Sequence, residues 1–76
     1  MDITLLNRIT INSSILAGKP VVRGIGISVD HILKMLARGI SHEAIISEYN
    51  LMEEVDIKAC LLYAATKISD EKEIAA

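Results

Sequence analysis

The sequence predicts a mainly helical domain in which three helices follow a short N-terminal segment of strand and loop. Two observations lead to this prediction. From residue 29 onward apolar residues recur at helical spacing, whereas the first 28 residues alternate or are interrupted by glycine and proline. The 76 residues suit one domain, 1–76, divided into an arm (1–28), three helices (29–68) and a charged tail (69–76).

The first regular element of the arm is expected to be a strand near Arg8–Ile11. Ile9 and Ile11 are apolar whereas Arg8 and Thr10 are polar, which is the period-2 pattern of a half-buried strand. The alternation fails before residue 8, so residues 1–5 receive no assignment. A turn is expected after the strand at 12–14, because Asn and Ser side chains bond nearby main-chain groups.

A loop rich in glycine separates this strand from the first helix. Val21 and Val22 are expected to be extended, and a second short strand is expected at Ile25–Ser28, directly before the helix. Gly24 and Gly26 allow the main chain to adopt positive φ on either side of Ile25.

The first helix has the clearest signals. Ser28 is a good N-cap, and Gly39 supplies a C-terminal stop. A helix is therefore predicted between these two residues. The stripe that should face the core follows i, i+3, i+4, i+7 spacing and consists of Val29, Ile32, Leu33 and Leu36.

Two more helices are expected after Gly39. Ser41 caps the second, and Asn50 can end it. Its buried side consists of Ile45, Ile46 and Tyr49. The third helix should run from about Glu54 to Ile68. A short helix joined to a longer one by a tight turn is typical of a helix-turn-helix unit.

The third helix carries more apolar surface than two short neighbouring helices can cover. One stripe consists of Ile57, Cys60, Leu61, Ala64 and Ile68, and it is widened by Ala59, Leu62 and Ala65. A helix that is apolar on most sides is normally buried on most sides. Two interpretations stand: the N-terminal strand covers the surplus, or a second copy does so in a homodimer.

Charge is unevenly distributed along the chain. The net charge is −2; residues 1–28 sum to +2, residues 29–52 to −1 and residues 53–76 to −3. An acidic balance argues against strong non-specific nucleic-acid binding by one monomer. If nucleic acid or another anion is bound, the expected contacts are Arg8, Lys19 and Arg23, the only basic cluster without a matching acidic excess. The alternative is a solvated loop in which Arg23 bonds main-chain carbonyls.

The sequence contains no recognisable catalytic, cofactor, metal or small-molecule site. Gly24 and Gly26 lack the third glycine of a dinucleotide fingerprint, and Gly18-Lys19 is followed by proline rather than by the Ser or Thr of a P-loop. His31 and His42 have no ligand at metal-binding spacing, and Cys60 is expected in the core. We expect a cytoplasmic protein that is not an enzyme. We also expect that it is not membrane-bound, because no apolar stretch approaches the roughly 20 residues of a membrane span.

Six segments, in order and spacing across residues 8–65, resemble the small prokaryotic family called domain of unknown function 433. They are Arg8-Ile9-Thr10-Ile11, Gly18-Lys19-Pro20-Val21-Val22-Arg23-Gly24, Ile32-Leu33, Gly39-Ile40-Ser41, Glu48-Tyr49 and Asp56-Ile57-Lys58-Ala59. The resemblance implies a winged or homeodomain-like helix-turn-helix fold. It also implies an antitoxin that neutralises a PIN-like ribonuclease, often encoded beside it, with autoregulation of the operon as an associated role.

The chain departs from the family pattern at two places. The family usually reads Gly-Thr-Arg-Ile-Pro-Val where this chain has Gly24 to Val29, so a second arginine is replaced by Gly26 and a proline by Ser28. The family also tends to place Thr or Ser near Glu53 as a cap. Glutamate caps poorly, so the third helix is expected to start late or to fray.

Two functions are therefore expected to compete. In the first, the chain masks a toxin through the apolar and acidic surface of its C-terminal half, because carboxylates complement a basic RNA-binding cleft. The candidate interface consists of Glu53, Glu54, Asp56, Leu61, Leu62 and Ala65. In the second, a dimer regulates transcription by binding DNA through its basic front.

Overall fold

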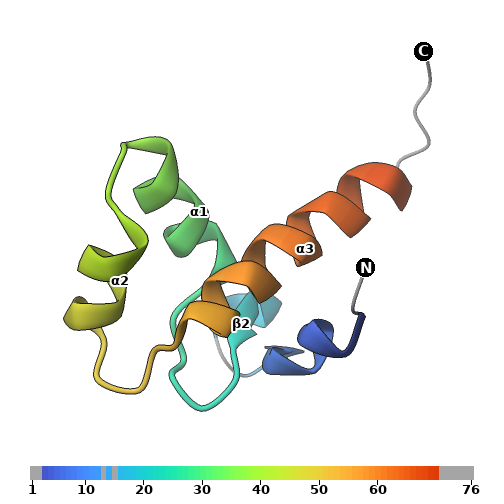
Figure 1. Cartoon of the computed structure of the whole chain (residues 1–76). Coiled ribbons are helices and arrows are strands. Elements are labelled where there is room, and N and C mark those ends of the chain that lie inside the picture. The colour runs from blue at the N-terminus through green and yellow to red at the C-terminus, as the bar shows by residue number, and fades with distance from the viewer. Residues whose placement is uncertain (1–2, 13, 15, 71–76) are drawn as a thin grey trace.

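The computed structural model describes residues 3–12, 14 and 16–70. Figure 1 shows the described chain as a cluster of helices beside a small sheet. The elements are the 3₁₀ helices η1 (Ile3–Arg8) and η2 (Leu16–Gly18), the strands β1 (Ile9–Ile11) and β2 (Pro20–Val22), and the helices α1 (Val29–Ala37), α2 (His42–Glu48) and α3 (Glu54–Asp70). The predicted mainly helical fold with short N-terminal strands is thus confirmed.

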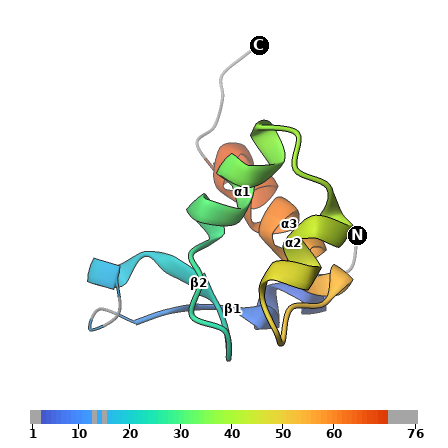
Figure 2. The same ribbon diagram turned by 90° about the vertical axis from the view of Figure 1, so that its left-hand side faces the viewer.

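The two strands form an antiparallel pair that projects to one side of the helices (Figure 2). Ile9 pairs with Val22, and Ile11 pairs with Pro20. The expected turn after β1 is present, because the Asn12 side chain accepts hydrogen bonds from the main-chain N and the hydroxyl of Ser14 at 2.9 and 2.7 Å. The strand near Arg8–Ile11 is therefore confirmed, and η1 occupies the stretch that the pattern left unassigned.

The second strand begins five residues earlier than expected. It is Pro20–Val22, and the expected strand at Ile25–Ser28 contributes only one isolated bridge, between Ser28 and Val21. The reason is a tight turn in which Ile25 and Gly26 both donate from their main-chain N to the Val22 carbonyl, at 3.1 and 2.9 Å. This turn requires φ of +85° at Gly24 and +81° at Gly26, which glycine adopts without strain.

The ends of α1 and α2 are formed as predicted. The Ser28 and Ser41 hydroxyls accept from the main-chain N of His31 and Ala44, at 3.0 and 3.1 Å. Gly39, with φ of +87°, closes α1 with a Schellman motif. In that motif Gly39 donates to the carbonyl of Leu36, and Ile40 donates to the carbonyl of Met35.

The core lies where β2 and the three helices meet. Its largest fully buried side chains are aliphatic or sulfur-containing: Ile32, Ile45, Ile57, Val21, Val22 and Cys60. The predicted helix faces are largely correct, although Met35 is buried in α1 while Leu33 and Leu36 are only half-buried. Ile46 and Tyr49 of α2 pack against the same cluster.

Helix α3 is longer at its C-terminal end than expected. Ser69 and Asp70 are helical, so two residues of the expected tail belong to the helix, and residues 71–76 lie outside the described part. Figure 1 shows the last turns of α3 extending past the other elements. Ile68 on these turns is 70% exposed.

Candidate functional site

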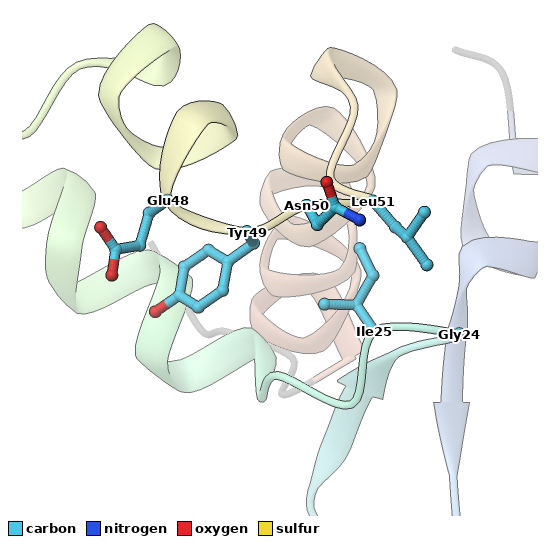
Figure 3. Close-up of a pocket in the computed structure, with 6 residues that line it drawn as sticks. All are labelled: Gly24, Ile25, Glu48, Tyr49, Asn50 and Leu51. Atoms are coloured by element: carbon cyan, nitrogen blue, oxygen red, sulfur yellow. The ribbon is translucent and has the colours of Figure 1, made fainter.

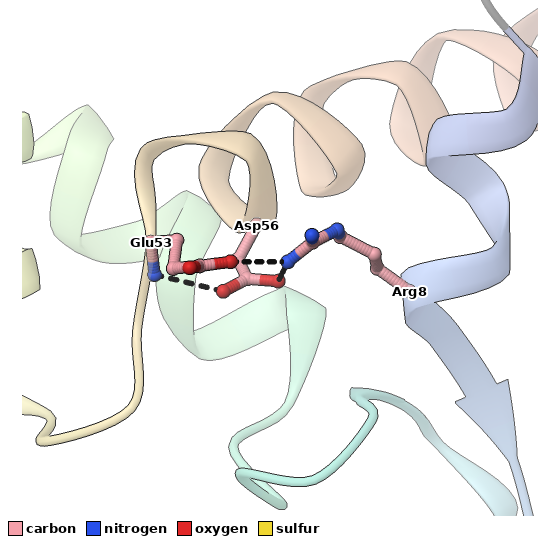
Figure 4. A network of polar contacts seen from close by, with 3 residues as sticks. All are labelled: Arg8, Glu53 and Asp56. Atoms are coloured by element: carbon pink, nitrogen blue, oxygen red, sulfur yellow. Dashed lines mark hydrogen bonds and ion pairs between the residues drawn. The ribbon is translucent and has the colours of Figure 1, made fainter.

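An ion-pair network joins the end of η1 to the start of α3 (Figure 4). Arg8 donates from Nη1 to Oε1 of Glu53 at 2.8 Å and to Oδ1 of Asp56 at 2.9 Å. The hydrogen bond to Asp56, followed in importance by the hydrogen bond to Glu53, raises the pKa of Arg8 above its ordinary value. The Asp56 side chain is only 5% exposed, so these contacts hold a carboxylate that is nearly out of solvent.

Asp56 also caps α3. Its Oδ2 accepts a hydrogen bond of 2.8 Å from the main-chain N of Glu53. In a capping box, this is the bond that the side chain of the third helical residue makes back to the main chain of the N-cap residue. The expectation that α3 starts late because glutamate caps poorly is wrong, since α3 begins at Glu54. The cap is supplied from within the helix rather than by the residue at its start.

The structure places Arg8 beside Arg23, whose main-chain N donates to the Arg8 carbonyl at 2.7 Å, but the three predicted basic side chains have different partners. Arg8 is bound by two carboxylates, and Lys19 lies 3.8 Å from Oδ2 of Asp30, which is also 3.4 Å from Lys34. The premise that this cluster has no acidic partners is therefore wrong for Arg8 and Lys19. Within the described residues Arg23 is exposed and makes no ion pair.

The structure brings together the three apolar residues predicted as an interface. Leu61, Leu62 and Ala65 line an open groove of about 310 Å³ on α3, together with Lys58 and with Leu5 of η1. Helix η1 packs against α3; Leu62 is 6% exposed, whereas Leu61 is 44% exposed. Leu5 was missed because no periodic pattern assigned its segment. We call Leu5, Lys58, Leu61, Leu62 and Ala65 the α3 groove.

The three acidic residues predicted as an interface have different surroundings. Asp56 is 3% exposed and presents no surface to a partner. Glu53 is exposed but pairs with Arg8, and Glu54 lies 2.8 Å from Nδ1 of His42. Of this set, Glu53 and Glu54 remain accessible at the start of α3.

The residues with catalytic or metal-binding side chains are dispersed. Cys60 is fully buried, and burial together with the nearby Asp56 charge raises its pKa to about 12, so the thiolate nucleophile does not form near neutral pH. His31 is exposed on α1, and His42 is half-buried beside Glu54. Across the described ranges no three His, Cys, Asp or Glu side chains gather where they could hold a metal ion.

A second cavity, also of about 310 Å³, lies between the α2–α3 connection and the turn after β2 (Figure 3). It is lined by Gly24, Ile25, Glu48, Tyr49, Asn50 and Leu51. The sequence did not predict this pocket because its two walls are some 24 residues apart in the chain and no local pattern indicates that they meet. We call these six residues the α2–α3 pocket.

The chain is thus a small, mainly helical protein with an apolar groove on α3 and a second pocket between the α2–α3 connection and the turn after β2. The family described as "Protein of unknown function (DUF433)" matches residues 9–64, so the chain belongs to that family. This confirms the family resemblance seen in the sequence. Comparison with curated proteins and with solved structures finds no match. No helix in the described part of the chain is long and apolar enough to cross a membrane.

Proposed function

We propose that the protein is an antitoxin: a non-enzymatic cytoplasmic protein that binds a PIN-like nuclease and blocks its RNA-binding cleft. Family membership supports this proposal through the function that the resemblance implies. The observation that carries it is the charge of one stretch of the chain. Between Arg38 and Lys58 there are five carboxylates and no Lys or Arg: Glu43, Glu48, Glu53, Glu54 and Asp56.

Four of these five acids are accessible. Asp56 is buried, whereas Glu43, Glu48, Glu53 and Glu54 are exposed on α2 and at the start of α3. A nuclease cleft that binds RNA phosphates must be basic, and exposed carboxylates without a Lys or Arg partner, here Glu43, Glu48 and Glu54, are its electrostatic complement. Exposed charges of this kind mainly accelerate association, so the antitoxin would find its toxin faster than neutral surfaces allow.

The proposal includes a homodimer built on the α3 groove. Its exposed Leu61 and the neighbouring Ile68 leave apolar surface that η1 does not cover. A domain of this size has little core of its own, and self-association is a common way to bury such surface. The dimer would leave α2 and the start of α3 free to face the nuclease.

The test uses the nuclease-like protein encoded beside this chain. We expect the purified pair to associate and RNA cleavage to be inhibited. Glu43→Lys should slow association at low salt and weaken its dependence on salt, because it reverses a charge on the acidic surface. Asp30→Lys is the matched control, since it reverses a charge on α1 that lies beside Lys19 and Lys34 and outside the acidic stretch.

Two outcomes would overturn the proposal. Absence of binding and inhibition would remove the antitoxin role. Equal slowing by Glu43→Lys and Asp30→Lys would show that the acidic surface does not face the nuclease. Circular dichroism of both variants checks that the fold is retained.

The runner-up is a dimeric DNA-binding regulator, and one observation favours it. The stretch from Lys19 to Arg38 holds four basic residues and only Asp30 as an acid. Phosphates would be repelled by the start of α3, so DNA would have to approach α1 and the turn after β2 instead. This function would be favoured if the protein does not bind the nuclease but binds the DNA of its own promoter. In Lys19→Ala/Arg23→Ala, the slope of the logarithm of DNA affinity against the logarithm of salt concentration should then fall by about one unit per lost contact.

A further inference from the structure

The α2–α3 pocket combines apolar walls with polar groups at its edge. Tyr49 and Leu51 come from the connection after α2, and Ile25 approaches from the turn after β2, as Figure 3 shows. Glu48 and Asn50 add a carboxylate and a carboxamide. Leu51 is 66% exposed, which leaves an apolar wall uncovered at the mouth.

We propose that this pocket binds one arginine side chain from a basic protein partner. The inference rests on the proposed function, because it names the point at which the nuclease would be held. The volume of about 310 Å³ lies at the lower end of ligand pockets, which suits a single side chain better than a nucleotide or cofactor.

The electrostatics select a cation. Glu48 makes no ion pair with any described residue, unlike Glu53 and Glu54, so its carboxylate is available. The pocket also lies at the carboxyl end of α2, where main-chain carbonyls without helical partners carry partial negative charge. A phosphate or carboxylate ligand would be repelled by both features.

The shape of the lining selects arginine over lysine. A guanidinium presents its flat face to an aromatic ring and its five N–H donors to carboxylate and carbonyl oxygens. Tyr49 supplies the ring, and its packing against the core cluster holds that ring in place. Figure 3 shows the Glu48 carboxylate beyond the Tyr49 ring, on the side away from Leu51. A guanidinium on that ring can therefore donate to Glu48, while Ile25 and Leu51 can contact the methylene stem.

The turn that carries Ile25 is part of this construction. Gly24 adopts φ of +85°, and the main-chain bond from Ile25 to Val22 folds the turn back toward the α2–α3 connection. Ile25 therefore supplies an apolar wall of the pocket.

The test is a titration of the ¹⁵N-labelled full-length chain with Nα-acetyl-arginine amide, followed by NMR. We expect saturable shifts confined to residues 24–25 and 48–51. The citrulline analogue has nearly the same shape without the charge, and we expect it to bind at least about fivefold more weakly because charge-assisted hydrogen bonds are stronger than neutral ones. Glu48→Gln should weaken the binding of Nα-acetyl-arginine amide by a similar factor.

Glu43→Gln is the matched control, because Glu43 is also exposed on α2 but does not line the pocket. It should leave the affinity unchanged within about twofold, since an exposed charge away from the contact is screened by water and salt. Shifts that do not saturate, equal binding of the citrulline analogue, or equal losses in Glu48→Gln and Glu43→Gln would each overturn the proposal. The probe requires no nuclease, so this result is independent of whether the antitoxin function holds.

Discussion

Asp56 shows at the scale of one residue what local patterns can and cannot predict. Ser28, Ser41 and Gly39 were assigned correctly as helix ends because their rules involve neighbours within four residues. Asp56 was interpreted as an accessible charge at a helix start. Its main partner, Arg8, is 48 residues away, so no local rule could reveal that the two neutralise each other.

Replacing Asp56 should therefore cost far more stability than replacing an exposed acid. Asp56→Ala leaves the Glu53 main-chain N without its acceptor and the Arg8 guanidinium with Glu53 alone, and we expect a loss of about 2 kcal/mol in the free energy of unfolding. Asp30→Ala removes contacts to two exposed lysines and should cost less than about 1 kcal/mol. Urea unfolding compares them, and equal losses would mean that the network contributes little to stability.

The Cys60 thiol gives the fold a dependence on alkaline pH. Its pKa rises from 9.0 to about 12 in the folded protein, so between these values the folded state holds a proton that the unfolded state has released. This contribution to stability is complete below pH 9.0 and declines as pH rises towards about 12, by up to about 1.4 kcal/mol per pH unit. Cys60→Ala should show a shallower decline of unfolding free energy across this window. Parallel pH profiles would contradict the assignment.

At the scale of the element, periodic segments were predicted well and short ones poorly. The helices were placed within about two residues because successive turns repeat the same apolar spacing and because Ser28, Ser41 and Gly39 mark helix ends. The strands are three residues each, too short for a period to be distinguished from chance. The expected strand at Ile25–Ser28 is wrong because the main chain forms a turn there, with positive φ at Gly24 and Gly26. The alternating apolar residues of so short a segment could not distinguish this turn from an extended strand.

The surplus apolar surface of α3 was correctly noticed but could not be assigned from sequence. One interpretation gave it to the N-terminal segment and the other to a second copy. Residues 3–8 form η1, which packs against α3; Leu62 is buried, whereas Leu61 stays accessible. The answer depends on where a 3₁₀ helix without a periodic signature packs, which is tertiary information.

At the scale of the whole molecule, most basic residues and most acidic residues lie in different stretches of the chain, and the two concavities lie on different elements. Lys19 directly precedes β2, Arg23 lies in the turn after it, Lys34 lies on α1 and Arg38 caps that helix, whereas the uninterrupted acidic stretch follows on α2 and the start of α3. The α3 groove and the α2–α3 pocket share no residue. Linear charge counts detected the acidic C-terminal half but missed the pocket, because Ile25 and Leu51 meet only in the folded chain.

The groove makes a prediction about assembly that is separate from toxin binding. We expect the protein to be a homodimer at micromolar concentration, because pairing two α3 grooves would bury Leu61 and Ala65 of both copies at once. Leu61→Glu should dissociate the dimer, since it would bury a charge at an apolar contact without a partner. The matched control is Ile11→Glu, which places the same charge on an apolar side chain that is 57% exposed on β1, away from the groove. Light scattering should therefore give twice the chain mass for the native protein and for Ile11→Glu, and the single-chain mass for Leu61→Glu. A single-chain mass for the native protein at high concentration would show that this apolar face serves a different partner.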